Sequence, residues 1–184
     1  MAEKPLKFPT PEAVIRKRRS DLHTKDELKE FIAKVVFITL AVWFLFSFVF
    51  AACRVSGMTM FPAIKDGDLV VAYRLNKKYK KDDVVVFEHN GKNCVGRAIA
   101  FENDTVTITK QGVLTVNGTR QQSDNIVYNT YPNSNEDFIL TVPQGKCFIL
   151  CDNREKCEDS RDFGSIPMKD VKGKVISVFR RRGI

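Results

Sequence analysis

The sequence lacks several features that would place the chain in a familiar class. It has no internal repeat, no low-complexity linker and no CxxC pair of the kind that holds a structural metal ion. No motif of a nucleic-acid-binding fold accompanies its basic residues. These absences argue against a zinc-binding module and against a DNA- or RNA-binding domain. We therefore predict no metal, no cofactor and no nucleic-acid partner.

The composition that is present suits one folded domain with an appendage. The chain has 184 residues, of which 43% are hydrophobic, and its formal net charge is +8. Nine lysines and arginines fall within residues 1–34, including the block RKRR at positions 16–19. The positive charge therefore belongs to the front of the chain and not to a folded surface.

An uninterrupted apolar run follows this basic segment. Residues 35–53 read VVFITLAVWFLFSFVFAAC, with no charge and with only Thr39 and Ser47 as polar residues. Nineteen residues of helix span roughly 28 Å, close to the thickness of the hydrocarbon core of a bilayer. The run predicts a single transmembrane helix. Because basic residues gather before it, residues 1–34 are predicted to be cytoplasmic and residues 54–184 to lie outside the cell membrane.

Two other interpretations of this run are weaker. A removable signal peptide has a short basic start and an apolar core of about 7–15 residues, whereas this core is longer and has 34 residues before it. Ala51, Ala52 and Cys53 faintly resemble a lipoprotein cleavage site, but Phe50 is bulky where a smaller aliphatic residue is usual. A buried helix of a soluble protein would not explain the asymmetric flanking charge.

The rest of the chain predicts short strands and no convincing helix of any length. These segments are rich in Val, Ile and Phe and are separated by turn sequences such as KDGD, NG and PQG. The pattern predicts a mainly β domain, an antiparallel β sandwich or barrel-like fold, with a polar loop at residues 121–136. The predicted strands are residues 68–73, 83–88, 94–101, 105–110, 113–116, 138–142, 147–150 and 174–179.

The five cysteines give no clear disulfide framework. They are Cys53, Cys94, Cys147, Cys151 and Cys157, an odd number that leaves at least one unpaired. Cys147 and Cys151 would lie about 13 Å apart along one strand, too far to bridge. A bridge between Cys151 and Cys157 is geometrically possible across the intervening loop. We interpret the cysteines mainly as core or incidental residues.

The stretch SGMTMFPA begins three residues after the apolar run. It offers two hydroxyls, on Ser56 and Thr59, and is either a catalytic corner for a substrate near the membrane or a turn beside it. Met58, Met60 and Phe61 suit contact with lipid or with an apolar substrate strand. The alternative is that these three side chains fill the interior of the corner.

Three longer stretches, in this order and spacing, resemble the serine–lysine type I signal peptidases of bacteria. They are GMTMFPAIKDGDLVV, CVGRAIAFENDTV and VPQGKCFILCDNREKCEDSRDFGSIPMKDVKGKV, and GVLTVNG between the second and the third fits the same pattern. The resemblance extends from the anchor to about residue 179. It implies a signal-peptidase β domain on a single membrane anchor, as in the Gram-positive form.

In that family, a serine directly before Met-x-Pro attacks the scissile carbonyl and a buried lysine takes its proton. A hydroxyl is a poor nucleophile without a base within hydrogen-bond reach, and a desolvated lysine has a pKa low enough to serve. The nucleophile position here is Thr59, and the lysine position in Val95-Gly96-Arg97 is Gly96. The resemblance therefore implies a degenerate catalytic pair.

No neighbouring residue replaces the missing groups convincingly. Lys92 lies four residues before Gly96, about 13 Å along a strand. His89 would help only if its hairpin folded inward. Ser56 is a hydroxyl, but it comes three residues early and lacks the Met-x-Pro turn.

The closing stretch matches the polar pattern of the family better. It implies a structural framework made of Arg97, Asp152, Asn153, Asp159, Ser160 and Arg161. We predict that Asp152, Ser160 and Arg161 belong to one buried or half-buried network. Cys151 replaces the usual glycine, and Cys157 stands where the family often has a serine near the lysine.

Two functions remain open after these comparisons of pattern. The first is a non-cleaving protein that holds exported precursors or pilin-like clients, similar to the signal-peptidase-like accessory proteins of Gram-positive pilus assembly. The second is an active signal peptidase, a serine-type endopeptidase that removes signal peptides. We favour the first, because losing a general base alone lowers a rate by about 10²–10⁴. Either function implies contact with membrane lipid.

Overall fold

The computed structural model describes residues 11–121, 129–155 and 157–180. The chain divides into two compact units, Met1–Phe46 and Ser47–Ile184, and we treat each by itself. Residues 122–128 of the predicted polar loop at residues 121–136 lie outside the described residues, as does the start of the basic segment.

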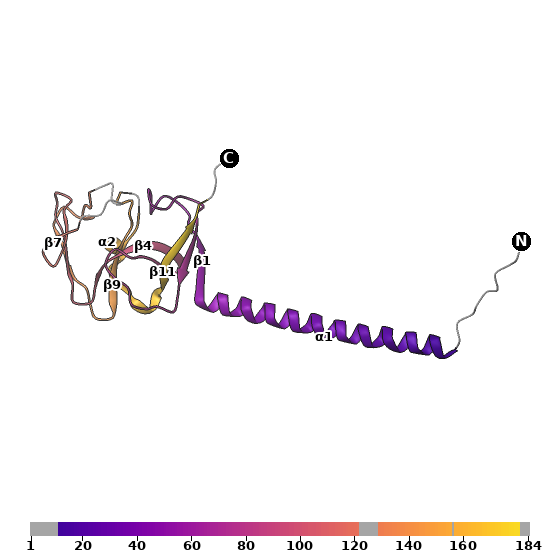
Figure 1. Cartoon of the computed structure of the whole chain (residues 1–184). Helices are drawn as coiled ribbons and strands as arrows, with labels where there is room; N and C mark the ends of the chain where they lie inside the picture. The colour runs from indigo at the N-terminus through magenta and orange to yellow at the C-terminus, as the bar shows by residue number, and fades with distance from the viewer. Residues whose placement is uncertain (1–10, 122–128, 156, 181–184) are drawn as a thin grey trace, which may run out of the picture. The chain divides into compact units, whose positions relative to one another are not determined.

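The first unit is a long helix, α1 (Pro11–Val49), drawn in indigo to purple in Figure 1. Its segment Lys25–Val49 has a mean hydropathy of 2.3 in its most apolar window, and none of that window is buried inside the protein. Large apolar side chains such as Phe37, Trp43 and Phe44 are exposed all round the helix. Such a helix needs an apolar solvent, so the prediction of a membrane-spanning segment is compatible with the structure.

The helix ends four residues earlier than the apolar run predicted. Phe50–Arg54 form strand β1, which pairs antiparallel with β2 (Leu69–Tyr73) in the register Phe50↔Tyr73 to Arg54↔Leu69. Helix and strand both accommodate apolar residues, so the composition of the run could not decide between them. Residues 50–54 form a strand and not a helix because β2 supplies hydrogen-bond partners to their backbone.

The second unit is built from two antiparallel sheets, as the sequence predicted. The larger sheet has the order β1-β2-β11-β3-β4-β9-β10, and the smaller has the order β7-β6-β5-β8. The further strands of the larger sheet are β3 (Val84–His89), β4 (Lys92–Phe101), β9 (Lys146–Leu150), β10 (Ile166–Pro167) and β11 (Val171–Phe179). Those of the smaller sheet are β5 (Thr105–Ile108), β6 (Leu114–Val116), β7 (Thr119–Arg120) and β8 (Phe138–Thr141).

All eight predicted strands are present, with ends shifted by a few residues. The sequence missed β1, β7, β10 and two short helices, α2 (Ser160–Phe163) and η1 (Met168–Asp170). The four residues of α2 agree with the prediction of no convincing helix of any length in this part of the chain. Its single turn is set by a capping box, in which Asp159 and Asp162 each accept a hydrogen bond from the other's backbone N–H.

The central strand β4 separates two parts of the hydrophobic core. Residues that face each other across an antiparallel pair point to the same side of the sheet. Val86 pairs with Val95, and both pack in a cluster with Met60 and Val70. Val85 pairs with Gly96 and packs on the other side. A side chain at position 96 would therefore point into the second cluster, which contains Phe87 and Ile149.

Candidate active-site corner

The corner that carries Thr59 is a compact turn between β1 and β2. It is closed by backbone hydrogen bonds from Val55 N to Asp68 O (2.9 Å) and from Ile64 N to Met60 O (2.9 Å). Gly57 adopts a φ of 86°, which favours glycine, and its N–H donates to the Asp66 carboxylate at 2.6 Å. Ser56 is exposed in this turn and Thr59 is half-buried.

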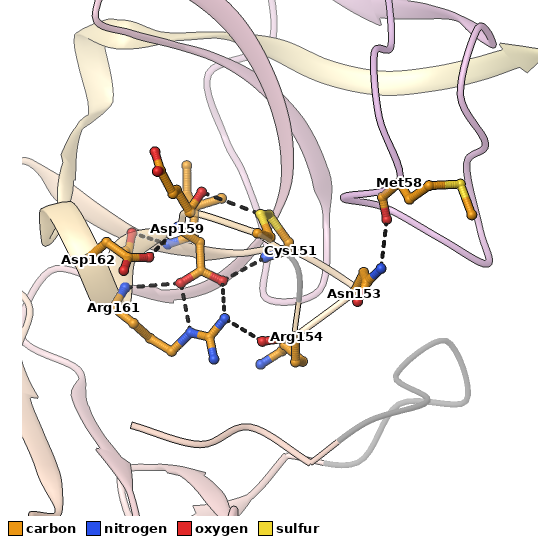
Figure 2. Close-up of a disulfide and its surroundings, with 11 residues drawn as sticks. Met58, Cys151, Asn153, Arg154, Asp159, Arg161 and Asp162 are labelled. Atoms are coloured by element: carbon orange, nitrogen blue, oxygen red, sulfur yellow. Dashed lines mark hydrogen bonds and ion pairs between the residues drawn. A yellow bond between two sulfur atoms is a disulfide. The ribbon is translucent and has the colours of Figure 1, made fainter. Parts of the chain in front are cut away.

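Asn153 ties this corner to the loop that follows β9. Its backbone N–H donates to Thr59 O at 2.9 Å, and its side-chain Nδ2 donates to Met58 O at 3.0 Å. Figure 2 shows the second of these bonds reaching from the loop to Met58. The backbone that presents the Thr59 hydroxyl is therefore held by a residue of the predicted framework.

The methionines of the corner have different environments. Met58 is 48% exposed and Met60 is fully buried, at 0%, in the cluster with Val55 and Ile64. The expectation that Met60 contacts lipid or substrate was wrong, because a helical turn at residues 60–64 directs this side chain into the core. Phe61 is half-buried. Met58 and Phe61 thus remain candidates for contact with a client or with lipid.

Gly96 stands at the position of the family's lysine, and neighbouring atoms surround the place where a side chain would begin. A Cβ atom added to Gly96 would lie 2.5 Å from Ile149 Cγ2, 3.2 Å from Phe87 Cε1 and 3.3 Å from Leu150 O. A contact of 2.5 Å is far inside van der Waals separation, so even alanine would require Ile149 to shift. Neighbouring side chains fill the start of the space that a lysine would need.

Neither proposed replacement base lies at this position. Lys92 is exposed at the start of β4, where it pairs across the hairpin with His89. The His89 ring stacks on Phe163, with ring centroids 4.1 Å apart. Within the described part of the chain, the Thr59 hydroxyl has no side-chain hydrogen-bond partner.

The framework contains a buried, bidentate ion pair between β4 and the loop after β9. Arg97 Nε donates to Asp152 Oδ1 at 2.8 Å, and Nη2 donates to Oδ2 at 2.7 Å. The two side chains are only 7% and 0% exposed. A third bond runs from Arg97 Nη1 to Asp82 O at 2.7 Å. The hydrogen bonds to Asp152 raise the pKa of Arg97, so this guanidinium stays charged in the core.

A second ion pair holds the start of α2. Arg161 donates from Nε to Asp159 Oδ1 (2.9 Å) and from Nη2 to Oδ2 (3.0 Å). The same guanidinium donates to the carbonyl oxygens of Tyr131 (3.0 Å) and Arg154 (2.8 Å), and Figure 2 shows its bonds to Asp159 and Arg154. These contacts connect three separate segments of the domain.

The predicted single network of Asp152, Ser160 and Arg161 was therefore wrong in its pairing. Asp152 pairs with Arg97, whereas Arg161 pairs with Asp159. Ser160 Oγ accepts a hydrogen bond from Ile149 N at 2.9 Å and contacts neither ion pair through its side chain. The three residues belong to one family pattern, but Asp152 lies in the loop after β9, whereas Ser160 and Arg161 lie in α2.

Arg154 is a buried residue of this loop that the sequence analysis did not single out. It is 2% exposed, and its Nη1 donates to Thr130 Oγ1 at 2.8 Å. Its Nε and Nη2 have no partner among the described residues. Burial lowers the pKa of Arg154 to about 10. Unlike Arg97, this guanidinium has no carboxylate bound to it among residues 11–121, 129–155 and 157–180.

Cys151 and Cys157 form a disulfide that closes the loop between the two ion pairs. Figure 2 shows Cys151 beside the pair of Asp159 and Arg161, with its backbone N–H donating to Asp159. Their Cα atoms are 6.3 Å apart. Of the possibilities left open by the sequence, this pair forms the bridge, and Cys151 is also part of the core. Cys53, Cys94 and Cys147 are free, and burial raises the pKa of Cys147 to about 12. That thiol is not a nucleophile at neutral pH.

The two disulfide sulfurs also lie within 4.8 Å of an oxygen of Asp159. Bridged sulfurs are not thiolates, and the Asp159 carboxylate is already bound to Arg161. These residues form a disulfide beside an ion pair, so they give no basis for assigning a metal site.

A hollow of about 400 Å³ lies beside β1. Its wall on one side is the small-residue stretch Ala51, Ala52 and Cys53, and Val86 and Asn93 line the facing side. β1 is at the edge of its sheet, so one side of its backbone has no strand partner among the described residues. An extended peptide could add there by backbone hydrogen bonds.

Comparison with known proteins gives one consistent result. A model of the family described as signal peptidase, peptidase S26, matches residues 28–180. Signal peptidase IB of Staphylococcus aureus (strain Mu50 / ATCC 700699) is 32% identical over 172 residues, which cover 82% of this chain and 88% of that protein. The probable thylakoidal processing peptidase 2 of Arabidopsis thaliana is 32% identical over 162 residues, which cover 80% of this chain but only 42% of that protein. A crystal structure of a signal peptidase I from Enterococcus faecalis V583 aligns with a TM-score of 0.46 and 31% identity, over 54% of this chain and 97% of that chain.

Proposed function

The chain belongs to the signal peptidase family, peptidase S26, and on that premise we propose that it is a membrane-anchored protein that holds exported precursors without cutting them. The proposal separates two properties that active members combine. One is a β domain with a site for an extended client, and the other is a nucleophile with a base beside it. This chain has residues suited to the first and lacks the groups needed for the second.

One observation carries the proposal, namely the closed space at Gly96. Catalysis by a hydroxyl requires a base within hydrogen-bond reach of its proton. Ile149 Cγ2 occupies the place where the first side-chain carbon of a base would begin. A nearby residue cannot substitute easily, because Lys92 is exposed at the far end of the strand.

The nucleophile position supports the same conclusion. Thr59 retains a hydroxyl, but its extra methyl group restricts χ1 and crowds the approach of a scissile carbonyl. Its hydroxyl stays protonated without a base, so the loss in rate is about 10²–10⁴ from the base alone. The binding surface does not depend on either group. We propose that the client lies extended along β1 and contacts Met58 and Phe61.

The clients we propose are exported precursors, including pilin-like subunits, that reach the outer side of the membrane. The basic residues before the apolar run support an orientation with residues 1–34 in the cytoplasm and the β domain outside. Labelling of intact cells with a membrane-impermeant maleimide tests this orientation. Asn135→Cys should be labelled and Thr10→Cys should not, in a chain whose Cys53 and Cys94 are replaced by serine. The opposite pattern would overturn the orientation.

The direct test of function uses the full chain in detergent with a radiolabelled precursor that carries a signal peptide. We expect no cleavage that depends on Thr59, and we expect cross-linking of the precursor to a photoreactive group placed at Met58. An active signal peptidase is the second candidate, favoured by the hydroxyl at Thr59 and by the intact framework. Cleavage by the wild type that disappears in Thr59→Ala would establish that second function and exclude the first.

A further inference from the structure

The segment that follows β2 begins at the end of the apolar helix. Arg74 N donates to Val49 O at 2.9 Å, and Arg74 Nη1 donates to Ser47 O at 3.4 Å. The rings of Phe50 and Tyr73 pack nearby with centroids 5.9 Å apart. Aromatic rings of this kind are typical of the boundary between a membrane and water. Arg74 therefore marks the place where the chain leaves the anchor.

From this place, residues 74–81 read RLNKKYKK, with five basic residues and no acidic residue. The stretch from Leu75 to Lys78 is exposed throughout, and Leu75 itself is 50% exposed. Lys77 Nζ donates to Val171 O, and Lys81 pairs with Asp104 at 3.1 Å. Lys78 and Lys80 have no side-chain partner among the residues that the structure describes.

The location of these basic residues near the end of α1 indicates which partner they bind. Four residues span at most about 14 Å, so Lys78 lies within that distance of Arg74 and its long side chain extends the reach further. An anionic membrane surface attracts basic groups over about a Debye length, roughly 8–10 Å. The other basic residue beside the helix end, Lys172, is neutralised by Glu88 at 2.6 Å. The free charge near the anchor therefore resides in residues 74–81.

We propose that residues 74–81, here called the juxtamembrane basic segment, bind the phosphate groups of anionic phospholipids in the leaflet from which α1 emerges. Arg74, Lys78 and Lys80 supply the charge, and the exposed Leu75 side chain enters the headgroup layer. This contact would attach the β domain to the membrane at a second place, in addition to α1. The inference rests on membrane anchoring and is independent of whether the protein cuts its client.

The test uses the full chain in nanodiscs of phosphatidylcholine alone or of phosphatidylcholine with phosphatidylglycerol. Hydrogen exchange of the amides of residues 75–81 is measured by mass spectrometry. We expect exchange to slow in the anionic discs by about fivefold for each lysine engaged. Lys78→Ser with Lys80→Ser should abolish the slowing, as should high salt.

A matched control removes two exposed lysines elsewhere, Lys110→Ser with Lys169→Ser. This variant should keep the lipid-dependent slowing. Equal exchange of the segment in both kinds of disc would overturn the proposal, since it would show a solvated loop. Equal loss of the slowing in the control variant would also overturn it, because the effect would then be due to the net charge of the domain.

Discussion

Two regions of the β domain, the framework of ion pairs and the corner that carries Thr59, differ in how closely they match the signal-peptidase pattern. The residues of the two ion pairs match it: Arg97 binds Asp152 and Arg161 binds Asp159, each through two hydrogen bonds. The departures that the resemblance implies lie at Thr59 in the candidate corner, at Gly96 in β4, and at Cys151 and Cys157, which close the loop between the ion pairs.

The difference teaches that the fold and the chemistry of this domain have separate requirements. An ion pair in the core must stay intact, because removing one partner leaves a buried charge without compensation. A catalytic base contributes to the rate and little to stability, and its space here is filled by Ile149. A chain that still uses the fold to bind a client can keep the first and lose the second.

The largest effect is expected from giving the corner a serine nucleophile and a lysine base. Thr59→Ser with Gly96→Lys alone leaves the Cβ of the new lysine 2.5 Å from Ile149 Cγ2. We therefore add Ile149→Ala, which removes that methyl group. A side chain at position 96 starts on the side of the sheet that faces Phe87 and Ile149, opposite the cluster that contains Met60, so the lysine must pass its own strand to reach Thr59. If it does, the triple variant should cleave a precursor about 10²–10⁴ times faster than the wild type, since nucleophile and base act together. Gel analysis of the cleaved product measures this. No gain would mean that the lysine stays in the second cluster.

The matched control for the rebuilt site is Thr59→Ser with Ile149→Ala. It has the serine and the space but no base, so it should gain little activity. If this double variant cleaved as fast as the triple variant, an unidentified base would serve the corner. In that case the contrast between the two regions would no longer hold.

The next largest effect is expected from breaking the framework at Arg97. Arg97→Met leaves the fully buried Asp152 carboxylate without its partner and should lower the free energy of unfolding by about 3–5 kcal/mol. Arg154→Met is the matched control, because Arg154 is equally buried but binds no carboxylate. Its removal should cost less than about 1 kcal/mol. Urea unfolding of the full chain in detergent measures both, and equal losses would show that burial and not pairing decides.

Much of this framework could be read from the sequence, but its pairing could not. The residues Asp152, Asp159 and Arg161 stand in a recognisable pattern from which a structural role was predicted, and each of them belongs to an ion pair in the structure. Arg97 and Asp152 are 55 residues apart, and no local rule relates them. They meet because β4 pairs with β9 in the register Arg97↔Leu150, which brings the residues just after β9 to Arg97.

The strands could be predicted from the local sequence. The corner could not, because its structure depends on residues from distant strands. Val, Ile and Phe at strand spacing indicate β structure locally. The end of α1 at Val49 depends on the distant partner β2, so the apolar run of residues 35–53 was assigned to one helix. The closure of the space at Gly96 depends on Ile149, on another strand. The spacing of Cys151 and Cys157 permitted a bridge but did not require it.

A smaller effect is expected from opening the disulfide that joins the two regions. Cys151→Ser with Cys157→Ser frees a loop with a sequence separation of 6, which corresponds to about 2 kcal/mol of loop entropy. We expect unfolding at lower urea with both ion pairs retained. The control is Cys53→Ser with Cys94→Ser, which removes two free thiols and should change stability by less than about 1 kcal/mol. No loss in the first variant would mean that the loop is held by the ion pairs alone.

The smallest effect concerns Asn153, the residue through which the framework holds the corner. Asn153→Ala removes the bond from Nδ2 to Met58 O but keeps the bond from its backbone N–H to Thr59 O, so the loss of stability should be only about 1 kcal/mol. The amide protons of residues 58–61 should nevertheless exchange about five times faster, because the corner loses its link to the loop after β9. Asn133→Ala is the control, since Asn133 is an exposed asparagine that bonds to Asp162 on the surface. If both variants leave exchange at residues 58–61 unchanged, the corner is held by its own turn, and the two regions are independent in structure as well as in chemistry.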